Sequence, residues 1–520
     1  MKQITVLWID DEIDLLKPHL LFLEGKGYRV ITAANGNDAL KYVSARENID
    51  IIFLDEQMPG KSGLEVLNEL KRLVPAIPVV MITKSEEENI MNQAIGAKIA
   101  DYLIKPVNPN QILLTIKKNL EHRQLISEKV TADYRTEFNR LGTTIRNASH
   151  WREWADIYRR IVYWEMQIDS GGEEMKEILS FQKAEANKEF ARYIKSVYLS
   201  WFSQNNDKPV LSPSLMRQYL FPLMEKNPQR HHVFLLIDNL RYDHWCVLSE
   251  ILSGFCRIEQ NDLYFSILPT TTQYARNALF AGLMPLEIDK LIPNLWTDED
   301  DSEEESKNTH EEQLLQMQMT RLGLKVPVHY EKILNEKSAK KLVDSFSNYS
   351  NIPLLVVVYN FMDALSHART TVGMLRELAG DEAAYRSLIQ SWFRHSQLLE
   401  LIKTCLHHER TVMITTDHGS VRVLNPVKVI GDRETSANLR YKTGRNLNYN
   451  PREVFAIRKP ADAHLPSLSL TSSYIFATCA DFLVYPNNYN HYASFYRNTF
   501  QHGGISLEEM IVPVALLLPK

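Results

Sequence analysis

The segment Phe234-Leu-Leu-Ile-Asp-Asn-Leu-Arg-Tyr-Asp243 predicts a buried strand that ends at a carboxylate. Five apolar residues, Val233 to Ile237, run without a break into Asp238, which is typical of a parallel strand covered on both faces. In an open parallel sheet, ligands bind beyond the carboxyl ends of the strands, so Asp238 is placed where a reactive site can form. Taken alone, this residue is more readily explained as a cap for the next helix.

Two later parts of the chain repeat this pattern of an apolar run followed by side chains of the types that bind metals, and a third part adds a histidine. A carboxylate and an imidazole four residues apart follow the run that begins at Leu354, and they share one face if the chain turns helical there. An adjacent pair follows the run that begins at Thr411, where Gly419 permits the turn that brings both side chains to one site. With a histidine close to the C-terminus, the added candidates are Asp363, His367, Asp417, His418 and His502. Such oxygen and imidazole ligands suit zinc or manganese without a thiolate.

The segment Leu268-Pro-Thr-Thr-Thr272 predicts a loop that enters a helix, with a run of threonines at the start. The free N–H groups and the dipole of a helix N-terminus attract phosphate, and a metal can hold a hydroxyl there as an alkoxide. The threonines therefore offer a nucleophile. An ordinary helix cap would be the preferred interpretation if the metal-binding residues were missing.

The ordered set Asp…Thr…Asp-x-x-x-His…Asp-His…His resembles the alkaline phosphatase superfamily, and Ile237-Asp-Asn-Leu-Arg-Tyr-Asp243 resembles its PglZ branch. The threonine segment, together with Gly282-Leu-Met-Pro285, is similar to the nucleophile segment of nucleotide pyrophosphatase/phosphodiesterases. The resemblance implies that Thr272 is the nucleophile, with Thr271 as the alternative, and that nucleotide or oligonucleotide diesters are the substrates. Phosphomonoesters stay open as substrates, because the sequence does not place the basic residue that selects them.

The same resemblance implies two zinc ions in this domain, with manganese as the alternative metal. The residues that it assigns to the first ion are Asp238, Thr272, Asp417 and His418. The residues that it assigns to the second ion are Asp363, His367 and His502. It also implies a phosphate-binding asparagine after the nucleophile, for which Asn294 is the candidate.

Residues 1 to 122 alternate between strands and amphipathic helices, which predicts a doubly wound, flavodoxin-like α/β domain. Polar residues follow the carboxyl ends of its expected strands, namely Asp10, Asp11, Asp55, Thr83 and Lys105. Three clustered carboxylates repel one another unless a hard cation such as Mg²⁺ lies between them, and an Asp carboxylate beside such an ion can attack a phosphoryl donor. The alternative, that these acids are helix caps, must account for several strand ends at once.

This segment resembles a response-regulator receiver domain over its whole length, including Met58-Pro59-Gly60 and the pair Lys105-Pro106, whose peptide is cis in receivers. The resemblance implies that a sensor histidine kinase phosphorylates Asp55. It implies that the ligands of Mg²⁺ are Asp10, Asp11, Asp55 and the backbone of Gln57. The residues that respond to the phosphoryl group are then Thr83, Tyr102 and Lys105. Phosphorylation can shift the balance between two conformations of a surface formed by the last helices of this domain. Dimerisation through that surface is the expected result.

Residues 123–205 lack strand signals and predict an all-α helical bundle that links two α/β domains. Apolar and aromatic residues recur there at helical spacing, as in Trp151, Trp154, Tyr158, Ile161 and Trp164. We interpret this stripe as core rather than as a platform for a ligand. The last domain, 206–520, is the expected alkaline-phosphatase-like α/β domain, and its acidic run 298–306 predicts a solvated loop.

The composition predicts a cytoplasmic protein that does not insert into membranes. The 59 Lys and Arg residues against 64 Asp and Glu give a formal charge of −5. The overall charge therefore does not indicate a nucleic acid or an anionic membrane as a binding partner. The four cysteines lack C-x-x-C spacing. No signal peptide is evident before the first strand, and no apolar run approaches the roughly 18 residues of a membrane helix. No helix-turn-helix or basic recognition helix indicates direct reading of DNA.

The combination of receiver, helical bundle and PglZ domain is similar to two-component response regulators that govern type IX secretion. That resemblance implies a sigma factor of the extracytoplasmic-function type as a partner. Two functions are therefore expected from the sequence. The last domain is either a zinc-dependent phosphodiesterase, or an inactive, metal-stabilised interaction module that displays a partner surface when Asp55 is phosphorylated.

Overall fold

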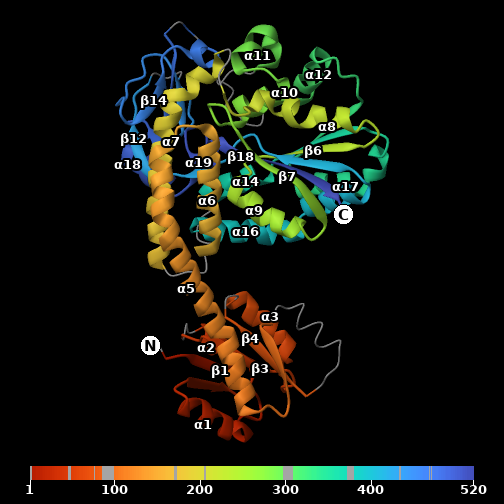
Figure 1. The fold of residues 1–520 in the computed structure, drawn as a ribbon, viewed down its shortest axis with the longest axis vertical. Coiled ribbons are helices and arrows are strands. Elements are labelled where there is room, and N and C mark those ends of the chain that lie inside the picture. The colour runs from red at the N-terminus through yellow and green to blue at the C-terminus, as the bar shows by residue number, and fades with distance from the viewer. Residues whose placement is uncertain are drawn as a thin grey trace. The chain divides into compact units, whose positions relative to one another are not determined.

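The structure is a computed structural model in which the chain forms two compact units, Met1–Asp133 and Tyr134–Lys520 (Figure 1). The residues that it describes are 3–44, 48–74, 77–84, 99–168, 173–203, 207–296, 309–371, 380–431, 435–467, 469 and 471–520. Within these ranges, the side chains of residues 44, 121–129, 173 and 367–371 are not described. The acidic run 298–306 lies outside the described residues.

The first unit contains a five-stranded parallel sheet with the strand order β2-β1-β3-β4-β5. The strands are β1 (Thr5–Ile9), β2 (Arg29–Ala33), β3 (Ile51–Asp55), β4 (Val79–Thr83) and β5 (Asp101–Ile104). The helices described in this unit are α1 (Lys17–Gly25), α2 (Gly36–Ser44), α3 (Gly63–Leu73) and the first part of α5 (Pro109–Asn147). This arrangement confirms the doubly wound, flavodoxin-like fold.

Alternate residues of β1 enter two separate hydrophobic clusters of this unit. Leu7 and Ile9 pack in one cluster with residues of α2 and α3. Val6 and Trp8 pack in the other with residues of α1 and α5. Because successive side chains of a strand point to opposite faces, this division shows that helices cover both faces of the sheet.

The second unit begins with a helical bundle made of the C-terminal part of α5, α6 (Trp151–Ile168) and α7 (Glu173–Val197). The predicted stripe is core, since Trp154, Tyr158 and Ile161 are buried in the same hydrophobic cluster as the strands of the next domain. The ring of Phe265 contacts aromatic rings of the bundle and of the turn after it. The bundle therefore packs on the α/β domain as part of one core.

That domain is built on a six-stranded sheet with the order β7-β18-β10-β6-β9-β8. Its strands are β6 (His232–Ile237), β7 (Cys256–Phe265), β8 (Val328–Ile333), β9 (Leu354–Tyr359), β10 (Thr411–Thr415) and β18 (Ile511–Pro519). Strands β10, β6, β9 and β8 run parallel, and β18 pairs antiparallel with both β10 and β7. The C-terminal strand is thus an interior strand of the sheet.

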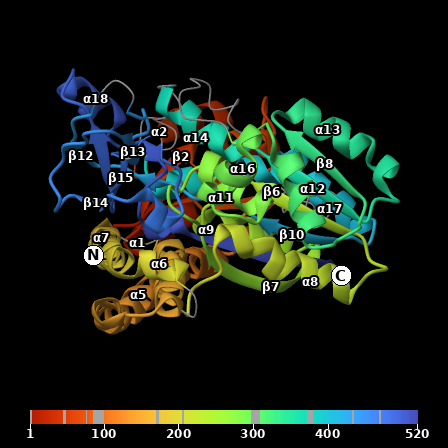
Figure 2. The same ribbon diagram turned by 90° about the horizontal axis from the view of Figure 1, so that it is seen from above.

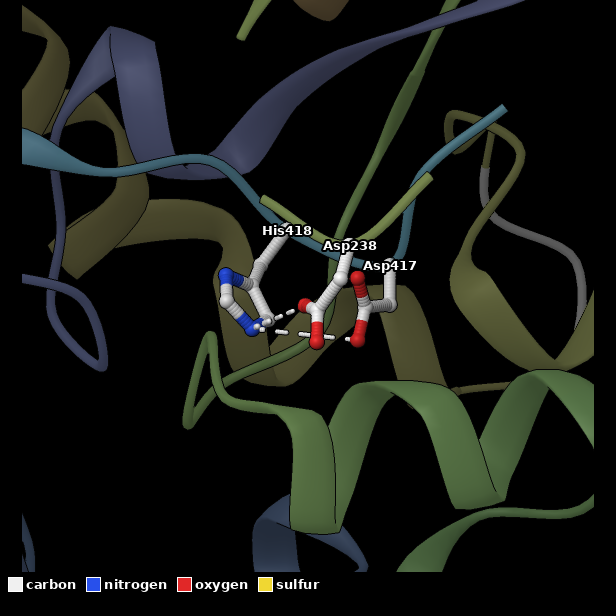
Figure 3. A group of neighbouring side chains, drawn as sticks. All are labelled: Asp238, Asp417 and His418. Atoms are coloured by element: carbon white, nitrogen blue, oxygen red, sulfur yellow. Dashed lines mark ion pairs between the residues drawn. The ribbon is translucent and has the colours of Figure 1, made fainter. Parts of the chain in front are cut away.

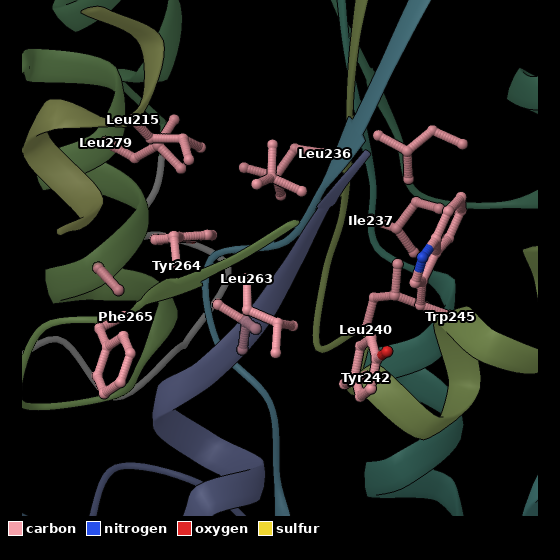
Figure 4. Packing of buried hydrophobic residues seen from close by; sticks show 14 of the residues in the cluster. Leu215, Leu236, Ile237, Leu240, Tyr242, Trp245, Leu263, Tyr264, Phe265 and Leu279 are labelled. Atoms are coloured by element: carbon pink, nitrogen blue, oxygen red, sulfur yellow. The ribbon is translucent and has the colours of Figure 1, made fainter. Parts of the chain in front are cut away.

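Helices cover both faces of this sheet (Figure 1). One face carries α8 (Phe221–Lys226), α10 (Asn277–Ala281) and α12 (Glu311–Arg321), and the other carries α9 (Tyr242–Leu252) and α16 (Glu382–His395). Leu279 of α10 and Trp245 of α9 lie on opposite sides of the strands (Figure 4). The remaining described helices near the sheet are α13 (Glu336–Asp344), α14 (Phe361–Thr371) and α17 (Gln397–His407).

Three small sheets lie to one side of the large sheet, together with α18 (Tyr489–Tyr496) (Figure 2). Their strands are β11 (Val421–Arg422), β12 (Asn425–Lys428), β13 (Tyr441–Gly444), β14 (Val454–Ile457), β15 (Ser473–Ala477), β16 (Asp481–Val484) and β17 (Phe500–Gln501). The short helix α19 (Leu507–Met510) leads into β18. In the described part of the chain, no helix is both long enough and apolar enough to cross a membrane.

Candidate functional sites

Asp238, Asp417 and His418 come together beyond the carboxyl ends of two neighbouring strands. Asp238 follows β6, the other two follow β10, and these strands pair in parallel. All three residues are buried, and their ligand atoms lie within 4.8 Å of one another. His418 Nε2 lies 3.8 Å from Asp238 Oδ1 and 3.7 Å from Asp417 Oδ2 (Figure 3). The two apolar runs of the sequence thus end at one common site.

Thr272 lies beside this cluster, at the first position of the π-helix η5 (Thr272–Arg276). Its Oγ1 is 3.1 Å from His418 Nε2. The neighbouring Thr271 is buried, and its Oγ1 has no hydrogen-bond partner among the described residues. Single π-turns occur frequently at functional sites. Of the two candidate nucleophiles, Thr272 is the one that contacts His418, a predicted metal ligand.

The second predicted group lies against the first. Asp363 lies in the first turn of α14. Its Oδ1 atom is 3.7 Å from Nε2 of His502. The rings of His418 and His502 stack with their centroids 4.3 Å apart and their planes 17° apart. Asn239, next to Asp238, donates a hydrogen bond from Nδ2 to Asp363 Oδ1 at 3.1 Å. The structure therefore joins the two groups at adjacent positions.

Two predicted residues are not placed in this cluster by described contacts. His367 lies within α14, but its side chain is outside the described residues. Asn294 is exposed in the 3-10 turn η6 (Pro293–Leu295). Its role in binding phosphate stays a prediction.

The electrostatics of the first group suit a divalent cation. Burial lowers the pKa of His418 to about 4, so its imidazole is neutral and free to bind a metal. Burial raises the pKa of Asp238 well above its usual value, and the neighbouring carboxylate of Asp417 adds to this effect. Asp238 Oδ1 is buried and accepts no hydrogen bond from the described residues. A cation bound there would pair with this oxygen and offset the free-energy cost of burying the two carboxylates.

Arg276 is a member of this site that the sequence patterns did not reveal. Its side chain is fully buried, with Nη2 2.5 Å from Asp238 Oδ2 and Nε donating to Asp417 Oδ2 at 3.0 Å. Burial alone would raise the pKa of Asp417, but Arg276 and His418 outweigh it and hold that pKa below its usual value. A signal was present in the sequence, because a residue four positions after Thr272 lies on the same side of a helix.

The receiver unit contains a second acidic cluster. The ligand atoms of Asp10, Asp11 and Asp55 lie within 4.8 Å of one another, at the carboxyl ends of β1 and β3. Lys105 Nζ lies 2.9 Å from Asp55 Oδ1 and 3.0 Å from Asp10 Oδ2. Burial raises the pKa of Asp55, against the effect of Lys105. The Lys105-Pro106 peptide is cis, as expected.

The remaining predicted receiver residues lie around this cluster. Thr83 is buried at the end of β4, and its hydroxyl donates to Glu56 Oε2 at 2.6 Å. Tyr102 is partly exposed on β5, and Gln57 is exposed after β3. The geometry offers three carboxylates for a hard cation such as Mg²⁺ and one lysine for a phosphoryl oxygen.

Comparison with known families gives a match for each part of the chain. The family described as "BREX system PglZ alkaline phosphatase-like domain" matches residues 215–517, and the chain belongs to this family. Residues 124–202 match "PorX response regulator linker domain", and residues 6–117 match "Response regulator receiver domain". The presence of all three in one chain matches the architecture of PorX. The receiver implies a phosphodonor such as a histidine kinase.

Two curated relatives each match about a quarter of the chain. The transcriptional regulatory protein ZraR of Klebsiella oxytoca is 34% identical over 142 residues, which are 27% of this chain and 32% of that protein. The alginate biosynthesis transcriptional regulatory protein AlgB of Pseudomonas aeruginosa is 36% identical over 124 residues, which are 24% of this chain and 27% of that protein. The chain thus spans about a third or less of the length of these relatives.

Solved structures of receiver domains also match. A receiver domain protein (CheY-like) from Methanospirillum hungatei is 27% identical, with a TM-score of 0.23, and the match covers 23% of this chain and 96% of that one. The response regulator TrrA from Thermotoga maritima, solved in complex with Mg²⁺ and BeF, is 30% identical, with a TM-score of 0.21 and coverage of 23% and 100%.

Proposed function

We propose that the chain is a two-component response regulator whose output is a zinc-dependent phosphodiesterase acting on nucleotides or oligonucleotides. The observation that carries the proposal is the contact between Thr272 Oγ1 and His418 Nε2, within a cluster that also contains Asp238 and Asp417. A hydroxyl held among potential metal ligands, at the start of a helical turn, is the arrangement that activates a nucleophile toward phosphorus.

The described residues fit one divalent metal ion, which would be held by Asp238, Asp417 and His418 with Thr272. A second ion is proposed at Asp363 and His502 together with His367, whose side chain lies outside the described residues. Zinc is the proposed metal, since neutral imidazoles and carboxylates suit it, and manganese is the alternative. When bound, the ions would act as Lewis acids. They would lower the pKa of an oxygen ligand and offset the negative charge of the phosphoryl oxygens.

The chain's own residues then carry out an in-line displacement. Thr272 Oγ gives up its proton to solvent and forms a bond to phosphorus, the ester P–O bond opposite to it breaks, and the alcohol leaves with a proton from solvent. Water next cleaves the bond between phosphorus and Thr272 Oγ, which restores the threonine hydroxyl and releases the phosphomonoester product. The 3.1 Å contact with His418 Nε2 places the threonine oxygen beside a proposed metal ligand. Asn294 is proposed to bind phosphate, and Thr271 is the alternative nucleophile.

Regulation is proposed to begin at Asp55, with a sensor histidine kinase as phosphodonor and Mg²⁺ held by the acidic cluster and the backbone of Gln57. Thr83, Tyr102 and Lys105 would respond to the phosphoryl group, and dimerisation would follow. By its likeness to PorX, the chain is proposed to regulate type IX secretion together with an extracytoplasmic-function sigma factor. The proposed compartment is the cytoplasm, where free thiols such as its four cysteines are stable. The proposed domain boundaries are 1–122, 123–205 and 206–520.

The test is hydrolysis of bis-p-nitrophenyl phosphate and short oligonucleotides by the zinc-loaded protein. Thr272→Val should abolish turnover while zinc content, measured by mass spectrometry, is retained. Thr271→Val is the matched control and should keep most of the activity. Hydrolysis of p-nitrophenyl phosphate under the same conditions separates diesters from monoesters as substrates. Full activity in zinc-loaded Thr272→Val would refute the threonine nucleophile.

A second candidate function is an inactive interaction module. It is favoured by Arg276, which already pairs with Asp238 and Asp417 and so can hold the site together without turnover. The module predicts no diester hydrolysis with zinc or manganese, and binding of the sigma factor that depends on phosphorylation of Asp55. Titration calorimetry with the phosphorylated and unphosphorylated protein would distinguish it from the enzyme.

A further inference from the structure

Arg276 links the ends of three adjacent strands at the proposed metal centre. Its guanidinium meets Asp417 after β10, Asp238 after β6 and, through Nη1 at 3.3 Å, the side-chain oxygen of Asn360 after β9. The side chain is 0% exposed and carries its charge within the protein interior. A buried charge is costly unless it is paired, so these contacts hold the guanidinium and the acids together.

The arginine binds the carboxylate of Asp238 on one side only. Nη2 contacts Oδ2, whereas Oδ1 faces His418 and has no hydrogen-bond donor among the described residues. The orientation of Asp238 is thereby fixed with one oxygen directed into the cluster.

A further buried carboxylate also pairs with Arg276. Glu311, in the first turn of α12, lies 3.4 Å from Arg276 Nη1. Its carboxylate also accepts from Tyr330 at 2.9 Å and lies 3.0 Å from Lys332 Nζ. The guanidinium therefore has a fixed place that does not depend on a metal.

We propose that Arg276 is a built-in cation of the first metal site, which holds Asp238 and Asp417 in place when no metal is bound. Without it, the metal-free protein would bury two adjacent carboxylates with no positive charge to pair with them. Bound zinc would supply that charge instead. The loss of Arg276 should therefore destabilise the metal-free protein much more than the zinc-bound protein.

The experiment measures the melting temperature of the full chain with chelator and with zinc, for the wild type and for Arg276→Met. Because a ligand stabilises the folded state in proportion to the logarithm of its affinity, the zinc-induced shift reports on the site itself. We expect a larger shift in Arg276→Met, equivalent to zinc affinity raised by about tenfold, because zinc then supplies the only positive charge that pairs with the two buried carboxylates. Arg276→Lys, which keeps a positive charge, should return the shift toward that of the wild type.

Arg410→Met is the matched control. Arg410 is also buried in the second unit, but it donates to the backbone oxygens of Tyr349, Ser350 and Ile352. Its loss should lower both melting temperatures equally and leave the zinc-induced shift unchanged. An unchanged shift in Arg276→Met would overturn the proposal and leave Arg276 as a purely structural residue.

If Arg276→Met does not fold, Arg276→Gln, which keeps a polar side chain without the positive charge, takes its place, and the same enlarged shift is expected. An unchanged shift in that variant would again contradict the proposal. The inference rests on the proposed metal site but needs no substrate. A protein that binds zinc and lacks turnover would therefore refute the phosphodiesterase without affecting this test, whereas a protein with no zinc-induced shift would refute the metal-site role of Arg276.

Discussion

Lys183 Nζ, on helix α7 of the linker bundle, lies 3.0 Å from Glu508 Oε1 in α19 of the PglZ domain. The same ammonium group lies 2.9 Å from Glu165 on α6 and 2.7 Å from Glu382 on α16. The backbone N–H of Gly419, the residue after His418, donates to the backbone oxygen of Glu509 at 3.2 Å. One lysine thus ties two linker helices to a segment that contacts the loop carrying His418.

Replacing Lys183 with Met should strongly destabilise the second unit. The change leaves three buried or nearly buried carboxylates without their shared cation, and breaking such a group typically costs about 3–5 kcal/mol. Chemical denaturation followed by circular dichroism measures the free energy of unfolding. Lys188→Met, at an exposed position of the same helix, is the control and should have little effect. A loss of under about 1 kcal/mol in Lys183→Met would show that the junction contributes little.

Glu165 should make stability depend on pH. Burial raises its pKa to about 7, and the nearby carboxylate of Glu382 adds to this effect, against the attraction of Lys183. The folded protein therefore keeps a proton that the unfolded chain releases near pH 4.5. This contribution is fully present below about pH 4.5 and is lost as the pH rises through about 7, with a slope of up to about 1.4 kcal/mol per pH unit.

The measurement is the free energy of unfolding at a series of pH values between 5 and 7, for the wild type and Glu165→Gln. The variant carries no titrating group at this position, so its stability should fall less steeply with rising pH. Glu177→Gln, at an exposed position of α7, controls for the removal of one negative charge. Equal slopes in the wild type and Glu165→Gln would contradict the raised pKa.

Gly419→Ala should disturb the metal centre through the backbone. A Cβ atom at this position would lie 2.0 Å from the backbone oxygen of Glu508, so one of the two segments must move. We expect a loss of about 1–3 kcal/mol in stability and a reduced zinc content, because His418 is the adjacent residue. Gly142→Ala on α5 is the control, since the atoms nearest to its Cβ are side-chain ends at 3.6 Å or more. Wild-type stability and zinc content in Gly419→Ala would contradict the close packing.

Asp55 should accept phosphate from a small donor when Mg²⁺ is present. Radiolabelled acetyl phosphate is expected to label the wild type but not Asp55→Asn, and chelation of Mg²⁺ should prevent labelling. The physical reason is that Lys105, 2.9 Å from Asp55, and a bound cation together offset the charge of the incoming group. Asp14→Asn, at an exposed position near β1, is the control and should be labelled normally. Labelling of Asp55→Asn would place the phosphoryl group elsewhere.

Local sequence patterns were sufficient to predict the buried strands and the polar residues at their carboxyl ends. Apolar runs such as Val233 to Ile237 predict buried parallel strands, and the carboxyl ends of parallel strands meet at one edge of a sheet. Asp238, Asp417 and His418 could therefore be brought together from the sequence, as could Asp10 and Asp55 in the receiver. The fold class came from the same periodicity, since it depends on the order of strands and helices along the chain.

Contacts between distant segments were decided only by the tertiary structure. The position of β18 between β7 and β10, the stacking of His418 on His502, and the junction at Lys183 join parts of the chain that no local pattern relates. The spacing from Thr272 could have pointed to Arg276, but its role was missed because the two aspartates and Glu311 that pair with it come from distant segments of the chain. Periodicity specifies which face of an element is buried, whereas the packing of whole elements selects the partners that each buried charge will meet.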